Sequence, residues 1–126
     1  MARFLTEFAG GLVPSEDMID ETTFRGAADS ALETLFRALT RAGDRHDFDA
    51  DMNNGALTVE FEDSPAKFVV SPNTPVRQIW VSAHSRSFKL DWNEAAGAFL
   101  LGDTGQTLTG LIGEHIGTQL GEEVKL

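Results

Sequence analysis

Carboxylates are concentrated in the first half of the chain, and they are the side chains whose type and spacing could do chemistry. Residues 16–51 hold ten acids against four arginines. The acids are Glu16, Asp17, Asp20, Glu21, Asp29, Glu33, Asp44, Asp47, Asp49 and Asp51. Carboxylate oxygens suit Mg²⁺, Ca²⁺, Mn²⁺ and Fe²⁺, and no soft ligand is present to favour copper or zinc. The pattern indicates an open, weakly binding, water-rich cation site. The simpler alternative is a solvated acidic face that keeps the protein soluble and an edge strand unpaired.

Trp80 is the second candidate, because it falls on the polar side of a predicted strand. Ile79 and Val81 lie on one face of that strand. Gln78, Trp80 and Ser82 lie on the other face. A large aromatic side chain on a solvent face either contacts a partner or lies beneath a loop or helix, and the alternation leaves both explanations open.

The charge balance changes along the chain, which indicates two surfaces with different partners. Residues 64–101 hold two acids, Asp91 and Glu94, against four bases. The bases are Lys67, Arg77, Arg86 and Lys89. The middle of the chain is therefore mildly basic, whereas the front is acidic.

Two helices and about six strands are predicted to position these residues. The first helix, capped by Thr22 or Thr23 and ended by Gly43, has its apolar residues three and four positions apart. These are Phe24, Ala28, Ala31, Leu35, Leu39 and Ala42. Glu33 and Arg37 on its polar side form a favourable i,i+4 pair, worth about 0.2–0.5 kcal/mol. The last helix is predicted over residues 107–120, where three glycines weaken it and tertiary packing must hold it.

Period-two alternation predicts the strands. They fall near residues 46–52, 57–62, 67–71, 78–82, 88–92 and 98–101. Asp47, Asp49 and Asp51 share one face of the first strand. Trp92 has the same parity as Phe88 in the fifth. Residues 1–21 show no sustained period and predict a mobile arm, so the single domain is expected over residues 22–126. We predict an α+β two-layer sandwich with both helices on one face of an antiparallel sheet.

Composition excludes several classes of function. A formal charge of −10 argues against nucleic acid as a partner. No apolar run approaches the roughly 20 residues needed to span a bilayer. The first residues resemble neither a signal peptide nor a presequence, which predicts a cytoplasmic protein. The absence of cysteine and of G-x-S-x-G and H-E-x-x-H motifs argues against an enzyme. His46, His84 and His115 show no ligand spacing and are interpreted as separate surface histidines. The alternative for His46, which borders the acidic strand, is that it adds a nitrogen ligand to the carboxylates.

Several motifs in order resemble the signature of the frataxin family. They are T-P-V-R-Q-I-W-V-S from Thr74 to Ser82, the pair Asp91-Trp92, and N-G-A-L-T-V from Asn54 to Val59. The resemblance covers roughly four-fifths of the chain and implies the same two-layer fold, with Trp80 on the open face of the sheet. It also implies weak Fe²⁺ binding at an acidic ridge, and a ferroxidase activity has been attributed to the family.

The resemblance assigns the acids to this ridge residue by residue. Asp47, Asp49 and Asp51 match strand positions, Asp29 matches a helix position, and Asp20 with Glu21 falls in the acidic segment before the helix. Arg37, Thr40 and Arg41 replace acids that bacterial members usually have. This interruption predicts lower iron affinity or a site displaced toward Asp44 and the strand. The candidate metal residues are Asp20, Glu21, Asp29, Glu33, Asp44, Asp47, Asp49 and Asp51.

Two functions of different classes compete. The first, implied by the resemblance, is an iron-binding accessory protein that meets a cysteine desulfurase and its iron–sulfur scaffold. Its expected contact residues are Arg77, Gln78, Trp80, Ser82 and Lys89. Such a protein is a monomer without metal and forms oligomers with iron. The second is an acidic secretion-type chaperone for an unfolded segment, which is typically a stable dimer. A nonspecific divalent-ion buffer is a third possibility.

Overall fold

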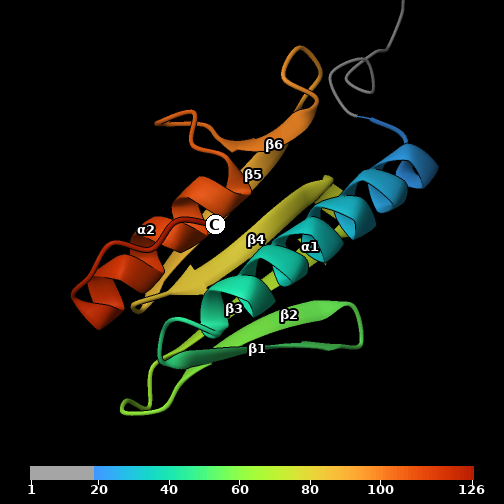
Figure 1. The fold of residues 1–126 in the computed structure, drawn as a ribbon. Helices are drawn as coiled ribbons and strands as arrows, with labels where there is room; N and C mark the ends of the chain where they lie inside the picture. Colours follow the sequence, from blue (N-terminus) through green and yellow to red (C-terminus); the bar gives the residue numbers. More distant parts are fainter. Residues whose placement is uncertain (1–18) are drawn as a thin grey trace, which may run out of the picture.

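The computed structural model describes residues 19–126 and has two helices on one face of a six-stranded antiparallel sheet (Figure 1). The helices are α1 (Glu21–Gly43) and α2 (Leu108–Leu120). The strands are β1 (Phe48–Asn53), β2 (Ala56–Phe61), β3 (Lys67–Asn73), β4 (Gln78–Ala83), β5 (Arg86–Asn93) and β6 (Ala98–Leu101). They pair in chain order, and a 3₁₀ turn, η3 (Thr74–Val76), joins β3 to β4. The predicted fold class is confirmed. The predicted arm over residues 1–21 lies mostly outside the described residues.

Helix α1 begins two or three residues earlier than predicted, because Asp20 caps it and not Thr22 or Thr23. The Asp20 carboxylate accepts from the Thr23 backbone N–H at 3.1 Å and from the Thr23 hydroxyl at 2.6 Å. An N-cap aspartate satisfies backbone donors that have no partner inside the helix. Asp20 and Glu21 are therefore parts of the helix start and not of an arm.

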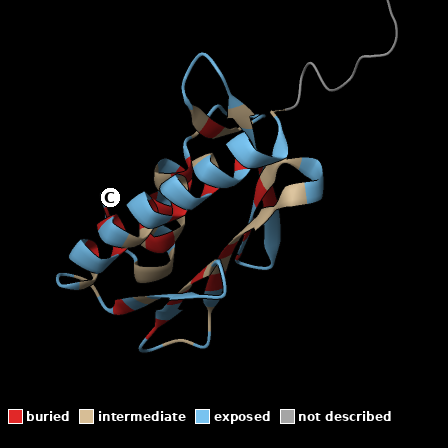
Figure 2. Cartoon of the chain, turned by 90° about the vertical axis from the view of Figure 1, so that its right-hand side faces the viewer, coloured by how far each residue is buried: buried red, intermediate tan, exposed pale blue. Residues whose placement is uncertain are grey.

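The core lies between the helices and one face of the sheet, as the buried segments in Figure 2 indicate. Its largest fully buried side chains are Phe24, Phe48, Phe68, Leu32, Leu35, Leu39, Leu57, Ile79, Leu90, Leu111, Ile112 and Ile116. The predicted stripe of α1 is correct except at Ala31, which is half-buried. Leu32 and Ala38 are buried but were not predicted to be. Since α1 lies across several strands, its contact stripe is wider than one row of side chains.

Glycines in α2 allow the C-terminal segment to cross the helix closely. A β-carbon at Gly117 would lie 2.8 Å from the Glu122 carbonyl oxygen, and one at Gly113 would lie 3.2 Å from that of Val124. Val124 itself is buried. Thr107, the first residue of the predicted helix, is its N-cap, because its hydroxyl accepts from the Gly110 N–H at 3.1 Å. The loss of helix propensity at these glycines is therefore offset by packing.

Candidate functional site

Trp80 lies on the face of the sheet that the helices leave open. Its side chain is 38% exposed, whereas its neighbours Ile79 and Val81 are buried beneath the helices. The strand register places Ser71 of β3 on one side of Trp80 and Lys89 of β5 on the other. The prediction that Trp80 shares the polar face is confirmed, and a covering loop or helix is excluded within the described residues.

A short polar chain fixes the Trp80 indole. Its Nε1 donates to the Gln78 side-chain oxygen at 2.9 Å, and the Gln78 amide nitrogen donates to the Asp91 carboxylate at 3.0 Å. The Lys89 ammonium lies 5.0 Å from the centroid of a Trp80 ring. An exposed cation–π contact of this kind is worth about 0.5–1 kcal/mol. The ring is therefore presented to solvent in a defined orientation.

The other expected contact residues divide into two groups. Ser82 is exposed on the open face, opposite Ser87 of β5 and the half-buried Val69 of β3. Arg77 instead turns away from the face. Its Nε donates to the Ile19 carbonyl at 3.2 Å, and its Nη1 donates to the Thr74 carbonyl. Arg77 therefore holds the start of the described chain against η3, which the sequence did not indicate. Val69 was not among the expected contact residues, although the alternation of β3 places it on the same face of the sheet as Trp80.

Two of the predicted strand acids lie on the same open face, at its β1 edge. Asp49 and Asp51 are exposed, and Asp49 stands directly opposite Glu60 of β2. Like charges directly opposite in a sheet repel. The Lys67 ammonium of β3 lies 3.8 Å from Glu60 and offsets part of this repulsion. Glu60 was not among the predicted metal residues, although the alternation of β2 indicates that Glu60 lies on the polar face of that strand.

The helix acids lie on the opposite layer, and several have partners. Glu21 pairs with Arg25 at 2.7 Å, and Glu33 pairs with Arg37 at 2.9 Å, as the i,i+4 spacing predicts. Hydrogen bonds from the Thr23 hydroxyl, and then from its backbone N–H, lower the pKa of Asp20. Three further predicted acids are exposed near the helix or at the start of β1, namely Asp29, Asp44 and Asp47.

The fold does not gather the predicted metal residues into one cage. Within residues 19–126, no three acidic, histidine or cysteine side chains are close enough together to hold a metal ion. The donors present are carboxylate oxygens, so their chemical type fits a hard, largely hydrated cation. The assignment of these acids to iron stays a prediction.

Two of the histidines lie next to each other in the fold, although the sequence analysis interpreted all three as separate. The Nδ1 atoms of His84 and His115 are 3.2 Å apart, although the residues are 31 positions apart in sequence. His46 is elsewhere, with its Nδ1 2.5 Å from the Glu122 carboxylate. Because the contact joins a β-turn to a helix, no sequence spacing could have indicated it.

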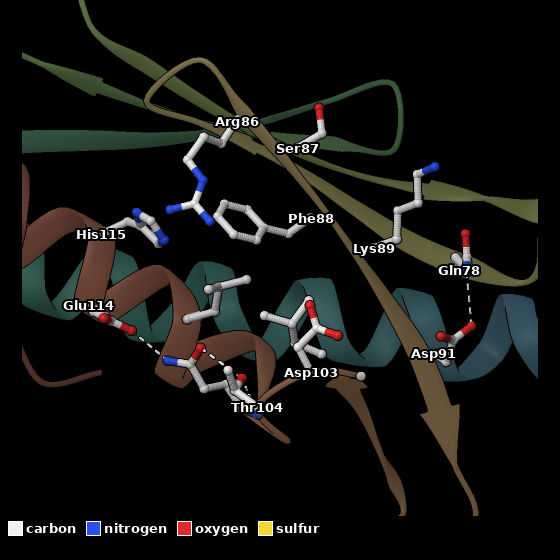
Figure 3. A pocket seen from close by; sticks show the side chains of 14 residues that line it. Gln78, Arg86, Ser87, Phe88, Lys89, Asp91, Asp103, Thr104, Glu114 and His115 are labelled. Atoms are coloured by element: carbon white, nitrogen blue, oxygen red, sulfur yellow. Dashed lines mark hydrogen bonds between the residues drawn. The ribbon is translucent and has the colours of Figure 1, made fainter.

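The surface has a hollow of about 660 Å³ between β5, α2 and the loop after β6 (Figure 3). One end of the hollow lies near Trp80 of β4 and is lined by Gln78, Lys89 and Asp91. Arg86, Phe88 and His115 line it at the other end, where the Arg86 guanidinium lies 4.9 Å from the Phe88 ring centroid. The hollow mixes charges of both signs, so it shows no single preference for ligand charge.

Comparison with known proteins defines the class. A family model described as a frataxin-like domain matches residues 17–122. A frataxin from Psychromonas ingrahamii has the same fold, with a TM-score of 0.73 at 23% identity over 85% of this chain and 97% of its own. The described part of the chain contains no helix long and apolar enough to cross a membrane.

Curated relatives agree with this class. One from Pseudomonas aeruginosa is 33% identical over 75% of this chain and 88% of its own length. One from Azotobacter vinelandii is 35% identical over 63% of this chain and 73% of its own length. Both carry the name iron-sulfur cluster assembly protein CyaY. The chain belongs to the frataxin family.

Proposed function

We propose that this chain is an accessory protein of iron–sulfur cluster assembly that docks onto a cysteine desulfurase–scaffold complex through the open face of its sheet. The exposed Trp80 indole, oriented by Gln78 and flanked by Lys89, is the observation that carries the proposal. Oriented aromatic side chains at the centre of a surface are common binding hot spots. The names of the curated relatives support the assembly role, and the cytoplasm is its expected location.

Iron enters this proposal as cargo. Fe²⁺ binds weakly to the carboxylates around Asp49, Asp51 and Glu60, where the register sets like charges opposite one another. A bound cation relieves that repulsion and keeps most of its water. The same acids supply a negative edge for a basic patch on the desulfurase, which would steer association. The proposal assigns no catalytic residue to the chain.

Family membership favours this function over the secretion chaperone. The chaperone hypothesis rested on small size, acidity and an α+β fold, which many proteins share. It predicts a stable dimer, whereas the proposal predicts a monomer without metal and association only when iron is present. Sedimentation of the full chain with and without Fe²⁺ separates the two.

Biolayer interferometry with the immobilised desulfurase–scaffold complex tests the docking surface. Trp80→Ala should weaken binding about 30-fold, which corresponds to the roughly 2 kcal/mol typical of a hot-spot side chain. Met52→Ala is the matched control, because Met52 is also 38% exposed but has the parity of buried Phe48, on the other face. Equal binding of wild type and Trp80→Ala would remove the open face as the docking surface.

A further inference from the structure

His84 and His115 form a pair that the proposed function does not use. His84 lies in the turn between β4 and β5, and His115 lies on α2. Their Nδ1 atoms face each other at 3.2 Å. Two nitrogen ligands on one tetrahedral Zn²⁺, each about 2.0–2.1 Å from the metal, are themselves about 3.3 Å apart. The separation therefore suits a shared metal.

A hydrogen-bond chain sets the tautomer of His84. Its Nε2 lies 3.0 Å from the Gln119 side-chain oxygen, while the Gln119 amide nitrogen donates to the Ser64 hydroxyl at 3.2 Å. Because the amide nitrogen faces Ser64, the oxygen faces His84, and Nε2 is the nitrogen that carries the proton. The Nδ1 of His84 then directs its lone pair at the Nδ1 of His115, with which it is in hydrogen-bond contact at 3.2 Å. Metal-binding histidines are typically fixed in this way by a partner on the other ring nitrogen.

The backbone at His84 is held in an uncommon conformation. His84 and Ser85 have φ of 52° and 62°. In two-residue hairpin turns, asparagine and glycine are the residues that usually adopt such positive values. Phe68 packs edge-on against the His84 ring, with the centroids 5.0 Å apart, and Phe88 lies 5.0 Å from the His115 ring. Strained backbone maintained by surrounding packing is often found at functional sites.

We propose that the Nδ1 atoms of His84 and His115 together bind one imidazole-preferring divalent cation, for which Zn²⁺ is the probe, with water completing its coordination. Zn²⁺ binds imidazole nitrogen readily, unlike the hard cations suited to the carboxylates of β1 and β2. The site is thus separate in place and in chemistry from the proposed iron surface, and it goes beyond the proposed function.

The charges around the pair have opposing effects. Burial first, and then the nearby His84, lower the pKa of His115. Glu114 on the same helix favours a cation, while the Arg86 guanidinium beside His115 opposes it (Figure 3). Removing the charge of Arg86 should therefore tighten metal binding.

Calorimetric titration of the full chain with Zn²⁺, together with ¹H–¹⁵N spectra of the imidazoles, tests the site. Zn²⁺ should shift the Nδ1 signals of both rings. Gln119→Leu removes the hydrogen-bonded partner of a ligand and should weaken Zn²⁺ binding about 10-fold. His84→Asn and His115→Gln each remove a ligand and should weaken Zn²⁺ binding by more than Gln119→Leu does. Arg86→Gln should bind more tightly than wild type. Asn tolerates the positive φ at position 84, which protects the turn.

His46→Ala is the control, since His46 pairs with Glu122 away from the site, and its Zn²⁺ affinity should equal that of wild type. Thermal melts of every variant check folding. The proposal is overturned if Zn²⁺ does not bind, if affinity is unchanged in both His84→Asn and His115→Gln, or if the imidazole shifts fall only on His46. None of these outcomes alters the Trp80 binding test.

Discussion

Trp80 and Gln78 lie two residues apart on the open face of β4, and the indole Nε1 donates to the Gln78 amide oxygen at 2.9 Å. Trp92, on the neighbouring β5, points to the other face and packs against Phe99 with the ring centroids 5.2 Å apart. The two tryptophans of the chain therefore report on different layers.

Truncation should separate their roles. Trp80→Ala should cost less than the about 3–5 kcal/mol of a typical core aromatic truncation, because the indole is exposed. Trp92→Ala should cost more than Trp80→Ala, because Trp92 packs on the core. Urea unfolding of both variants measures this. In single-tryptophan Trp→Phe variants, iodide should quench Trp80 more readily than Trp92. If Trp80→Ala is the more destabilised variant, Trp80 is a core residue.

Fe²⁺ should perturb the backbone amide signals of Asp49, Asp51 and Glu60, with weaker effects at Asp47 and Asp20. The open carboxylate surface predicts weak binding, in which Mn²⁺ competes with Fe²⁺. An NMR titration under anaerobic conditions measures the shifts. Glu60→Gln should reduce them, and Glu123→Gln near the C-terminus is the control. Perturbation confined to β4 and β5 would contradict this surface.

Salt should stabilise the fold. The net charge of −10 repels itself in the compact state, and Asp49 stands directly opposite Glu60. Raising NaCl from about 0.01 to 0.15 M shortens the Debye length from about 30 to 8 Å. The melting temperature should therefore rise, and it should rise less in Glu60→Gln. A melting temperature that does not change with salt would show that the carboxylates are neutralised within the protein.

Acid should remove the contribution of the α1 cap. Thr23 hydrogen bonds lower the pKa of Asp20 below its ordinary value of 3.8, so this contribution is fully present above that value and is lost as pH falls through the lowered pKa. Asp20→Ala should be less stable than wild type at pH 7, with the difference narrowing near pH 2. Asp20→Asn retains a capping oxygen without titrating and is the control. Thermal melts at both pH values measure the difference, and a gap of constant size would contradict the assignment.

Two glycine substitutions should have opposite effects. A β-carbon at Gly26 in α1 meets nothing within 4 Å, so Gly26→Ala should raise the free energy of unfolding by about 0.8–1.0 kcal/mol. Gly117→Ala gains the same propensity, but its β-carbon would lie 2.8 Å from the Glu122 carbonyl. It should lower stability. Urea denaturation of both variants measures the signs, and stabilisation by both would show that the C-terminal segment moves away at little cost.

Local periodicity in the sequence determined the fold class and the side of the sheet on which Trp80 lies. Side chains alternate along a strand and recur every three or four residues along a helix, so Ile79 and Val81 identify the buried face of β4 without any knowledge of its neighbours. The same reasoning placed Asp49 and Asp51 together on one face of β1, and it predicted the Glu33–Arg37 pair.

Only the tertiary structure decided which residues meet across elements. Asp49 faces Glu60 because of the β1–β2 register, and Arg77 turns to Ile19 because the chain enters α1 beside η3. His84 and His115 meet because α2 packs beside the β4–β5 turn. A local pattern fixes a side chain's face relative to its own helix or strand, whereas contacts between elements depend on strand register and on where each helix packs. The acids and histidines of this chain therefore acquired their neighbours only on folding.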